Sequence, residues 1–179
     1  MDFTCSDTVT HPAEVVHGLL RDDMTKILPY LPDVAAIEVL TREDEERGVR
    51  LVNLWRASET AVPKVAKAFL KPEMLTWKDH ALWLHAERKA EWRLEPNVGA
   101  DLFTCNGSTS VVPADEVSCR IDVRGTLNVY PERVKGLPRL LAGKMRSTIE
   151  SFVVRMIVPN METMARGVQG YLDDQNQQG

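Results

Sequence analysis

Residues 118–130 read SCRIDVRGTLNVY, and polar and apolar side chains alternate along this stretch almost without exception. Successive side chains of a β-strand point to opposite faces, so the stretch predicts a strand with one apolar and one polar face. The expected apolar face comprises Cys119, Ile121, Val123, Gly125, Leu127 and Val129. A sheet with one apolar face must be covered by another element, and the chain that follows this strand is available for that role.

The C-terminal part of the chain carries methionine-rich apolar positions at helical spacing, which predicts a long amphipathic helix. Its apolar positions are Met145, Ile149, Phe152, Val153, Met156, Ile157, Met161, Met164, Val168 and Leu172. Pro159 lies inside this pattern and predicts a kink, because proline removes a backbone hydrogen bond. If the helix covers the sheet loosely, the gap between them is a ligand cavity lined by adaptable methionines. The same stripe of methionines is also typical of an ordinary core.

The rest of the chain predicts an antiparallel sheet preceded by a short helical region. We expect strands over residues 3–9, 34–42, 49–58, 82–94, 101–112 and 118–130. Thr10 is a candidate N-cap for the helix that follows the first strand, with Pro12 in its first turn. Residues 59–80 break the alternation and predict an inserted short helix. The expected fold class is therefore α+β, a curved antiparallel sheet wrapped around a long C-terminal helix.

Length and composition predict one domain. A chain of 179 residues with 44% hydrophobic content can bury a single good core, so we expect one domain over residues 1–172. The polar residues 173–179 are expected to form a frayed tail. The net charge of -4 argues against nucleic acid as a partner, because phosphate binding requires a concentrated basic surface.

The sequence also predicts a soluble, cytoplasmic protein without a metal or cofactor. No apolar run approaches the roughly 20 residues that span a bilayer, and the N-terminus has no basic segment followed by an apolar one. Cys5, Cys105 and Cys119 are odd in number and lack CxxC spacing, which favours buried reduced thiols over disulfides or zinc. The histidines form no metal-binding motif, and no catalytic residue is assigned. The oligomeric state is not predicted.

Three short segments resemble a known superfamily. They are Val9-Thr10-His11-Pro12-Ala13-Glu14-Val15-Val16, Pro32-Asp33-Val34 and Gly48-Val49-Arg50. Each is similar to the corresponding segment of the START-like, or SRPBCC, superfamily, which includes polyketide cyclase-like proteins and lipid-transfer domains. The chain most resembles a subgroup of uncharacterised bacterial proteins. The resemblance implies the helix-grip fold and a hydrophobic ligand held between the sheet and the C-terminal helix.

Arg88 is the most unusual residue of the predicted inner face. If residues 82–94 form one strand, Arg88 shares a face with Leu84, Ala90 and Trp92. A buried guanidinium needs a partner, so Arg88 is a candidate anchor for a ligand carboxylate or phosphate. Alternatively, a β-bulge turns Arg88 to the other face, or Arg88 pairs with Asp7.

Other polar residues and glycines also fall on the predicted inner face. Asn53 is a candidate to orient a ligand carbonyl, or it is an ordinary structural amide. Gly107 and Gly125 either leave room for a ligand or mark bulges that bend the sheet. The full set of candidate ligand-binding residues is Arg88, Asn53, Trp55, Trp92, Phe103, Thr109, Met145, Ile149, Phe152 and Met156.

The inserted segment of residues 61–74 carries Lys64, Lys67 and Lys71 opposite an apolar face. This pattern predicts transient contact with an anionic membrane, or simply a solvated surface helix.

Three functions fit these observations. The first is non-catalytic binding, and possible transport, of an apolar or amphipathic, lipid-like small molecule. The second is a cyclase or hydratase acting on a polyketide-like substrate, with Arg88 stabilising an enolate. The third is an interaction module whose cavity is filled by its own side chains.

Overall fold

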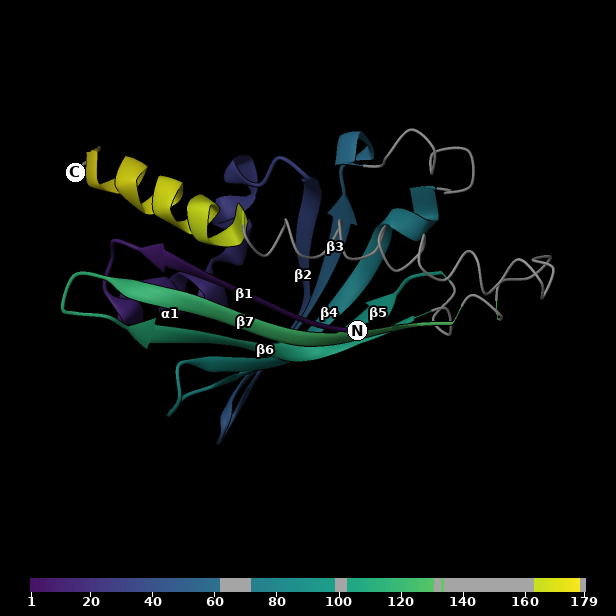
Figure 1. Cartoon of the computed structure of the whole chain (residues 1–179), viewed down its shortest axis with the longest axis horizontal. Helices are drawn as coiled ribbons and strands as arrows, with labels where there is room; N and C mark the ends of the chain where they lie inside the picture. The colour runs from purple at the N-terminus through teal and green to yellow at the C-terminus, as the bar shows by residue number, and fades with distance from the viewer. Residues whose placement is uncertain (62–71, 99–102, 131–132, 134–162, 178–179) are drawn as a thin grey trace.

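The fold is known from a computed structural model that describes residues 1–61, 72–98, 103–130, 133 and 163–177. In these parts of the chain, seven strands form one antiparallel sheet in the order β1-β7-β6-β5-β4-β3-β2. The strands are β1 (Asp2–Val9), β2 (Val34–Glu45), β3 (Gly48–Ala57), β4 (Thr76–Leu84), β5 (Lys89–Pro96), β6 (Phe103–Pro113) and β7 (Cys119–Val129). The sheet is strongly bent, so that β2 and β3 cross β1 and β7 at a large angle (Figure 1).

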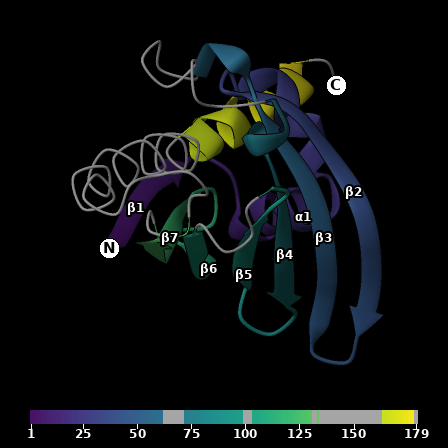
Figure 2. The ribbon, with the colours of Figure 1, turned by 90° about the vertical axis from the view of Figure 1, so that its right-hand side faces the viewer.

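Helical segments follow β1, lie between β3 and β4, and end the described chain. They are α1 (Ala13–Asp22), η1 (Met24–Tyr30), η2 (Glu59–Ala61), η3 (Pro72–Leu75) and the helix of residues 163–177. Figure 2 shows the sheet from its end, with β2 to β5 side by side and the helix of residues 163–177 on one side of them. Together with the sheet they form the predicted α+β architecture of a curved antiparallel sheet with a C-terminal helix.

The strand register defines the inner face of the sheet in rows that run across the strands, because directly paired residues of antiparallel strands share a face. The first row contains Cys5, Val123, Thr109, Ala90, Trp83 and Val49. The second row contains Phe3, Gly125, Gly107, Trp92, Ala81 and Leu51. The third contains Leu127, Cys105, Leu94, Asp79 and Asn53. The fourth contains Trp77 and Trp55, with Phe103 and Val129 paired at the same end of the sheet.

Helix α1 covers the first of these rows. It packs on β6 and β7, and its residues Val16 and Leu20 are fully buried. The ring of His17 meets the ring of Trp83 edge to face, with centroids 5.4 Å apart. This end of the inner face is therefore a closed core.

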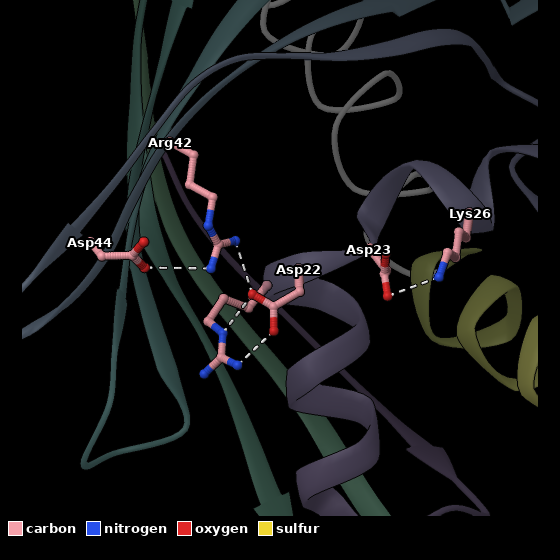
Figure 3. Close-up of polar contacts among 6 residues, drawn as sticks. Asp22, Asp23, Lys26, Arg42 and Asp44 are labelled. Atoms are coloured by element: carbon pink, nitrogen blue, oxygen red, sulfur yellow. Dashed lines mark hydrogen bonds and ion pairs between the residues drawn. The ribbon is translucent and has the colours of Figure 1, made fainter.

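An ion-pair cluster links the end of α1 to the edge strand β2 (Figure 3). Arg42 of β2 donates to Asp22 of α1 at 2.9 Å, and Arg21 holds the other oxygen of the same carboxylate at 2.6 Å. The hydrogen bonds from Arg21 and then Arg42 hold the pKa of Asp22 below its usual range. Next to the cluster, Lys26 pairs with Asp23 at 3.0 Å. These pairs are partly exposed, so their main effect is on the orientation of α1 rather than on its stability.

The helix of residues 163–177 is held against the start of α1 and against η1. The backbone N–H of Thr10 donates to Gln169 Oε1 at 2.7 Å, and His11 Nε2 lies 2.9 Å from Asp173 Oδ1. Tyr30 donates its hydroxyl to Asp174. The tail expected from residue 173 onward thus begins as part of this helix, and the side chains of Asp173 and Asp174 bind the N-terminal region.

Two predicted elements differ from the structure. Residues 82–94 are not one strand, since β4 and β5 are joined by a turn of residues 85–88. Leu84 pairs with Lys89 across this turn, so alternation cannot be carried through it, and Trp83 rather than Leu82 shares the inner face with Trp92. The strand predicted from residue 82 also starts too late, because β4 begins at Thr76.

Several predictions fall outside the described residues. They concern Met145, Ile149, Phe152, Met156, the kink at Pro159, and the lysines Lys64, Lys67 and Lys71. Within the described ranges, no helix is long and apolar enough to cross a membrane.

Two aromatic rings fill the space above the glycines of the second row. A Cβ on Gly125 would lie 2.4 Å from the Phe3 ring, and one on Gly107 would lie 2.6 Å from the Trp92 ring. The rings of Phe3 and Trp92 stack on each other with centroids 6.5 Å apart. The space left by the glycines is therefore occupied by the protein itself and is not free for a ligand.

This close approach makes a prediction about stability. A Cβ on Gly107 would also lie 2.1 Å from the backbone oxygen of Arg124, which cannot move aside as a side chain can. Gly107→Ala should therefore lower the free energy of unfolding by about 3 kcal/mol, measured by urea unfolding. Gly18→Ala is the matched control, since a Cβ at Gly18 in α1 would meet no atom within 4 Å. It should stabilise the protein by about 0.5 kcal/mol. Equal effects of the two substitutions would contradict the packing described.

Candidate functional site

The third and fourth rows of the inner face bring a carboxyl, an amide and two indoles together. Asn53 and Trp55 lie on β3, and Asp79 and Trp77 lie directly opposite them on β4. The two indole rings stack with centroids 6.2 Å apart and an angle of 16° between their planes. We call these four residues the Asp79 site. Strands β3 and β4 position all four side chains, because consecutive odd-numbered residues of each strand point to the inner face.

Two polar atoms of the Asp79 site are buried without a partner. Asn53 is only 2% exposed, and its Oδ1 accepts no hydrogen bond. The Nε1 of Trp55 is likewise buried and donates none. The third such atom among the described residues is Nε2 of His17, a residue of α1 that does not belong to the Asp79 site. A buried polar group without a partner costs roughly 1–3 kcal/mol, so two of them on the same face of β3 call for an explanation.

The carboxyl of Asp79 has an unusual affinity for its proton. Burial raises the pKa of Asp79 to about 7, and a side-chain hydrogen bond with Asn53 lowers it in part. Asp79 keeps some accessible surface, but the protein atoms crowded around its carboxyl disfavour the charge. Since Asn53 Oδ1 has no partner, the amide nitrogen of Asn53 is the group that donates to this carboxyl. Asp79 is therefore divided between its neutral and ionised forms near neutral pH.

The described inner-face residues around the Asp79 site are apolar and include no cationic side chain. Leu94 pairs with Asp79 across β4 and β5, and Cys105 pairs with Leu94 across β5 and β6. Burial, with a smaller effect of the Asp79 charge, raises the pKa of the Cys105 thiol to about 12, so this thiol is neutral. Along the inner-face rows of β3 to β7, as far as the chain is described, there is no lysine or arginine.

The structure separates the predicted site residues into three groups. Asn53 and Trp55 belong to the Asp79 site, and Phe103 lies half-buried at the same end of the inner face. Trp92 and Thr109 lie in the closed core, where Trp92 Nε1 donates to Thr109 Oγ1 at 3.1 Å. That bond satisfies both side chains without a ligand.

The third group is Arg88 alone, and its predicted position on the inner face is wrong. It lies in the turn between β4 and β5 with a φ of 44°, and its side chain is 38% exposed. Its guanidinium pairs with Glu14 of α1, and its backbone oxygen accepts from Val111. The turn contains no glycine, proline or asparagine, so the usual sequence signal for a chain reversal was missing. With Arg88 outside the inner face, the enolate-stabilising role considered for it loses its structural basis.

Asp79 and Trp77 were missed by the sequence analysis. Trp77, Asp79, Ala81 and Trp83 alternate with polar or outward-facing residues, which is the signal of a strand. That signal was missed because residues 59–80 were taken to break the alternation and the strand was expected to begin only at residue 82. A carboxylate on a strand face otherwise formed by tryptophans would have been the clue.

A separate groove of about 800 Å³ lies on the outer face of the sheet. It is open to solvent, and most of its charged side chains are already paired. Lys89 pairs with Glu91 at 3.2 Å, and His80 pairs with Glu95 at 2.9 Å. Because these charges compensate one another, the groove is a weaker candidate than the Asp79 site.

The raised pKa of Asp79 predicts an unusual dependence of stability on pH. The folded chain holds this proton more tightly than the unfolded chain, whose carboxyl has the ordinary pKa of 3.8. Stability is therefore lost as the pH rises from about 4 to about 7. Asp79→Asn cannot ionise, so it should be more stable than the wild type by about 3 kcal/mol at about pH 8 and little different at about pH 4.

The control for this experiment is Asp122→Asn. The hydrogen bond from Arg120, with a smaller one from Ser6, lowers the pKa of Asp122, so ionised Asp122 stabilises the fold above the unfolded pKa. Its loss should destabilise the protein at about pH 8, the opposite sign to Asp79→Asn. Urea unfolding across this pH range measures both effects, and parallel pH profiles for wild type and Asp79→Asn would show that Asp79 has an ordinary pKa.

The chain is similar to known proteins in its fold, but its sequence identity to them is low. No family model and no curated protein matches the chain. The Zhui aromatase/cyclase of Streptomyces sp. R1128 superposes with a TM-score of 0.65 at 15% identity, covering 94% of this chain and 93% of that one. Norcoclaurine synthase of Thalictrum flavum, in complex with dopamine and hydroxybenzaldehyde, superposes with a TM-score of 0.62 at 16% identity, covering 97% and 87%.

A START superfamily protein of Mycobacterium smegmatis also matches over 97% of both chains, with a TM-score of 0.55 at 14% identity. The predicted resemblance is thus confirmed at the level of the fold. A bent antiparallel sheet with a C-terminal helix, shared over nearly the whole length of these structures, gives this chain the helix-grip fold of the START-like superfamily.

Proposed function

We propose that this protein binds an apolar or amphipathic small molecule against the inner face of its sheet, with the polar end of the ligand at the Asp79 site. The observation that carries the proposal is the pair of buried, unpartnered atoms Asn53 Oδ1 and Trp55 Nε1. A core built only for stability has no reason to keep a free acceptor and a free donor together. A ligand group that bonds to both removes their cost.

Partial burial of large apolar side chains supports the same location. Trp55, Leu94 and Phe103 are half-buried, whereas the first row under α1 is almost fully buried. This contrast fits a ligand that covers the open end of the inner face. Met145, Ile149, Phe152 and Met156 remain part of the proposal as the opposite wall, on the strength of their helical spacing in the sequence.

The fold comparison is compatible with this proposal. The similar structures include an aromatase/cyclase and a synthase in complex with dopamine and hydroxybenzaldehyde. We propose that the present chain likewise accommodates a small organic molecule. A transient membrane contact through Lys64, Lys67 and Lys71 and a cytoplasmic location remain predictions from the sequence.

Catalysis is a second candidate function, and one observation favours it. Asp79, with its pKa raised to about 7, is an acid–base group of the kind that the sequence alone did not offer. If the protein is an enzyme, Asp79 exchanges a proton with the bound molecule. A bound compound that is altered by the wild type and bound unaltered by Asp79→Asn would assign catalysis, whereas an unchanged compound in both would assign binding alone.

Two substitutions on opposite faces of the sheet test the proposed binding. Leu94 lies on the inner face between Asp79 and Cys105, and Leu82 lies on the outer face of the neighbouring strand. Both are half-buried leucines. Leu94→Trp should fill the proposed binding space and weaken binding of the neutral dye Nile red by about tenfold or more, while Leu82→Trp should leave it unchanged. Fluorescence titration measures both affinities, and thermal unfolding checks that both variants are folded.

Native mass spectrometry of the protein purified from cells provides an independent measurement. A retained small molecule in the wild type that is absent from Leu94→Trp is the expected result. Wild-type protein that is empty and binds no neutral apolar probe would overturn the proposal.

A further inference from the structure

The hydrogen-bonding groups of the Asp79 site restrict the chemistry of its ligand. Trp55 Nε1 can only donate, and Asn53 Oδ1 can only accept. A hydroxyl group both donates and accepts, so a ligand hydroxyl can supply each of the two kinds of bond that these atoms lack. A carboxylate or a phosphate ester anion accepts only, and it would leave Asn53 Oδ1 without a donor.

We propose that the Asp79 site selects ligands that end in an uncharged hydroxyl group and rejects ligands that end in a carboxylate or phosphate. This inference rests on the proposed binding function and adds the class of ligand to it. It also reverses the expectation from Arg88, which would have favoured an anionic ligand.

The charges around the site lead to the same selection. The described inner-face rows of β3 to β7 offer no lysine or arginine to neutralise an anion. The titratable groups near the ligand position are Asp79 on β4 and the neutral thiol of Cys105 on β6. His80 follows Asp79 in sequence but points to the outer face, where it pairs with Glu95. An anionic ligand would therefore bring a second negative charge next to Asp79 without compensation.

The burial of Asn53 makes the mismatch costly. At 2% exposure, its amide cannot turn to water when a ligand fails to donate to it. Its amide nitrogen is already used by the Asp79 carboxyl, so when Asp79 is ionised, exchanging the two ends of the amide would place its oxygen against a carboxylate. Sites that bind a hydroxyl through buried polar atoms discriminate strongly against ligands that cannot reproduce the bonds.

Three compounds of matched shape test this inference by isothermal titration calorimetry. They are naphthalene, 2-naphthol and 2-naphthoate, which differ only in the group that would reach the Asp79 site. At about pH 8 the wild type should bind 2-naphthol about tenfold more tightly than 2-naphthoate, because Asp79 is then mainly ionised and repels the carboxylate. Trp55→Phe keeps an aromatic ring but removes the N–H donor. This substitution should weaken the binding of 2-naphthol about fivefold and leave the binding of naphthalene unchanged.

The role of Asp79 has two independent tests. Asp79→Asn removes the charge and should raise the affinity for 2-naphthoate about fivefold or more at about pH 8. The wild type itself should show the same gain when the pH falls to about 6, since Asp79 is then mainly neutral while the ligand stays ionised. This pH arm needs no variant and remains decisive if Asp79→Asn does not fold.

The outcomes separate this inference from the proposed function. In one outcome, Leu94→Trp blocks the binding of naphthalene, but 2-naphthoate binds the wild type as tightly as 2-naphthol does. The proposed selectivity is then wrong, and the proposed binding function stands. If none of the three compounds binds the folded wild type, both are wrong. A preference for 2-naphthol over 2-naphthoate in the wild type, together with weaker binding of 2-naphthol in Trp55→Phe, supports both.

Discussion

The stacking of Phe3 and Trp92 over two glycines organises the inner face of the sheet. Gly125 and Gly107 allow the two rings to lie against the strands, where any side chain at either glycine would collide with them. The rings come from β1 and β5, so their contact joins strands on either side of β6 and β7. Glycines in strand interiors also permit sharp local bending, in keeping with the strong curvature of this sheet.

This row of rings and glycines divides the inner face into two regions. On one side, α1 covers a closed core in which polar groups such as Trp92 Nε1 and Thr109 Oγ1 satisfy each other. On the other side, the Asp79 site keeps polar atoms that find no protein partner in the described chain. The same sheet thus supplies a rigid support and a face with unused hydrogen-bonding capacity.

The Asp79 site is also the place where the chain departs from rules that favour stability. A carboxyl on an aromatic face, a buried amide with a free oxygen and an indole with a free N–H each disfavour folding to some degree. Deviations of this kind are most often found at functional sites, where another requirement outweighs stability. Their concentration in four residues of two paired strands is the main reason to regard this part of the sheet as a binding site.

Much of the fold could be predicted from the sequence because alternation reports directly on which face is buried. Residues 118–130 gave the inner face of β7 correctly, with Cys119, Ile121, Val123 and Leu127 almost fully buried. The candidate site was predicted only in part. Asn53 and Trp55 were identified because they lie on a regular strand, whereas Asp79 was missed and Arg88 was misplaced.

The difference between these cases has a physical cause. Local alternation along single strands determined the α+β class and the apolar face of most strands, with β4 as an exception. The pairing between strands decided which residues meet, because the turn at residues 85–88 changes which side chains face inward after it. Only that tertiary pairing could bring Asn53 against Asp79, raise the pKa of the carboxyl by burial, and leave a donor and an acceptor without partners on a face whose described residues include no lysine or arginine.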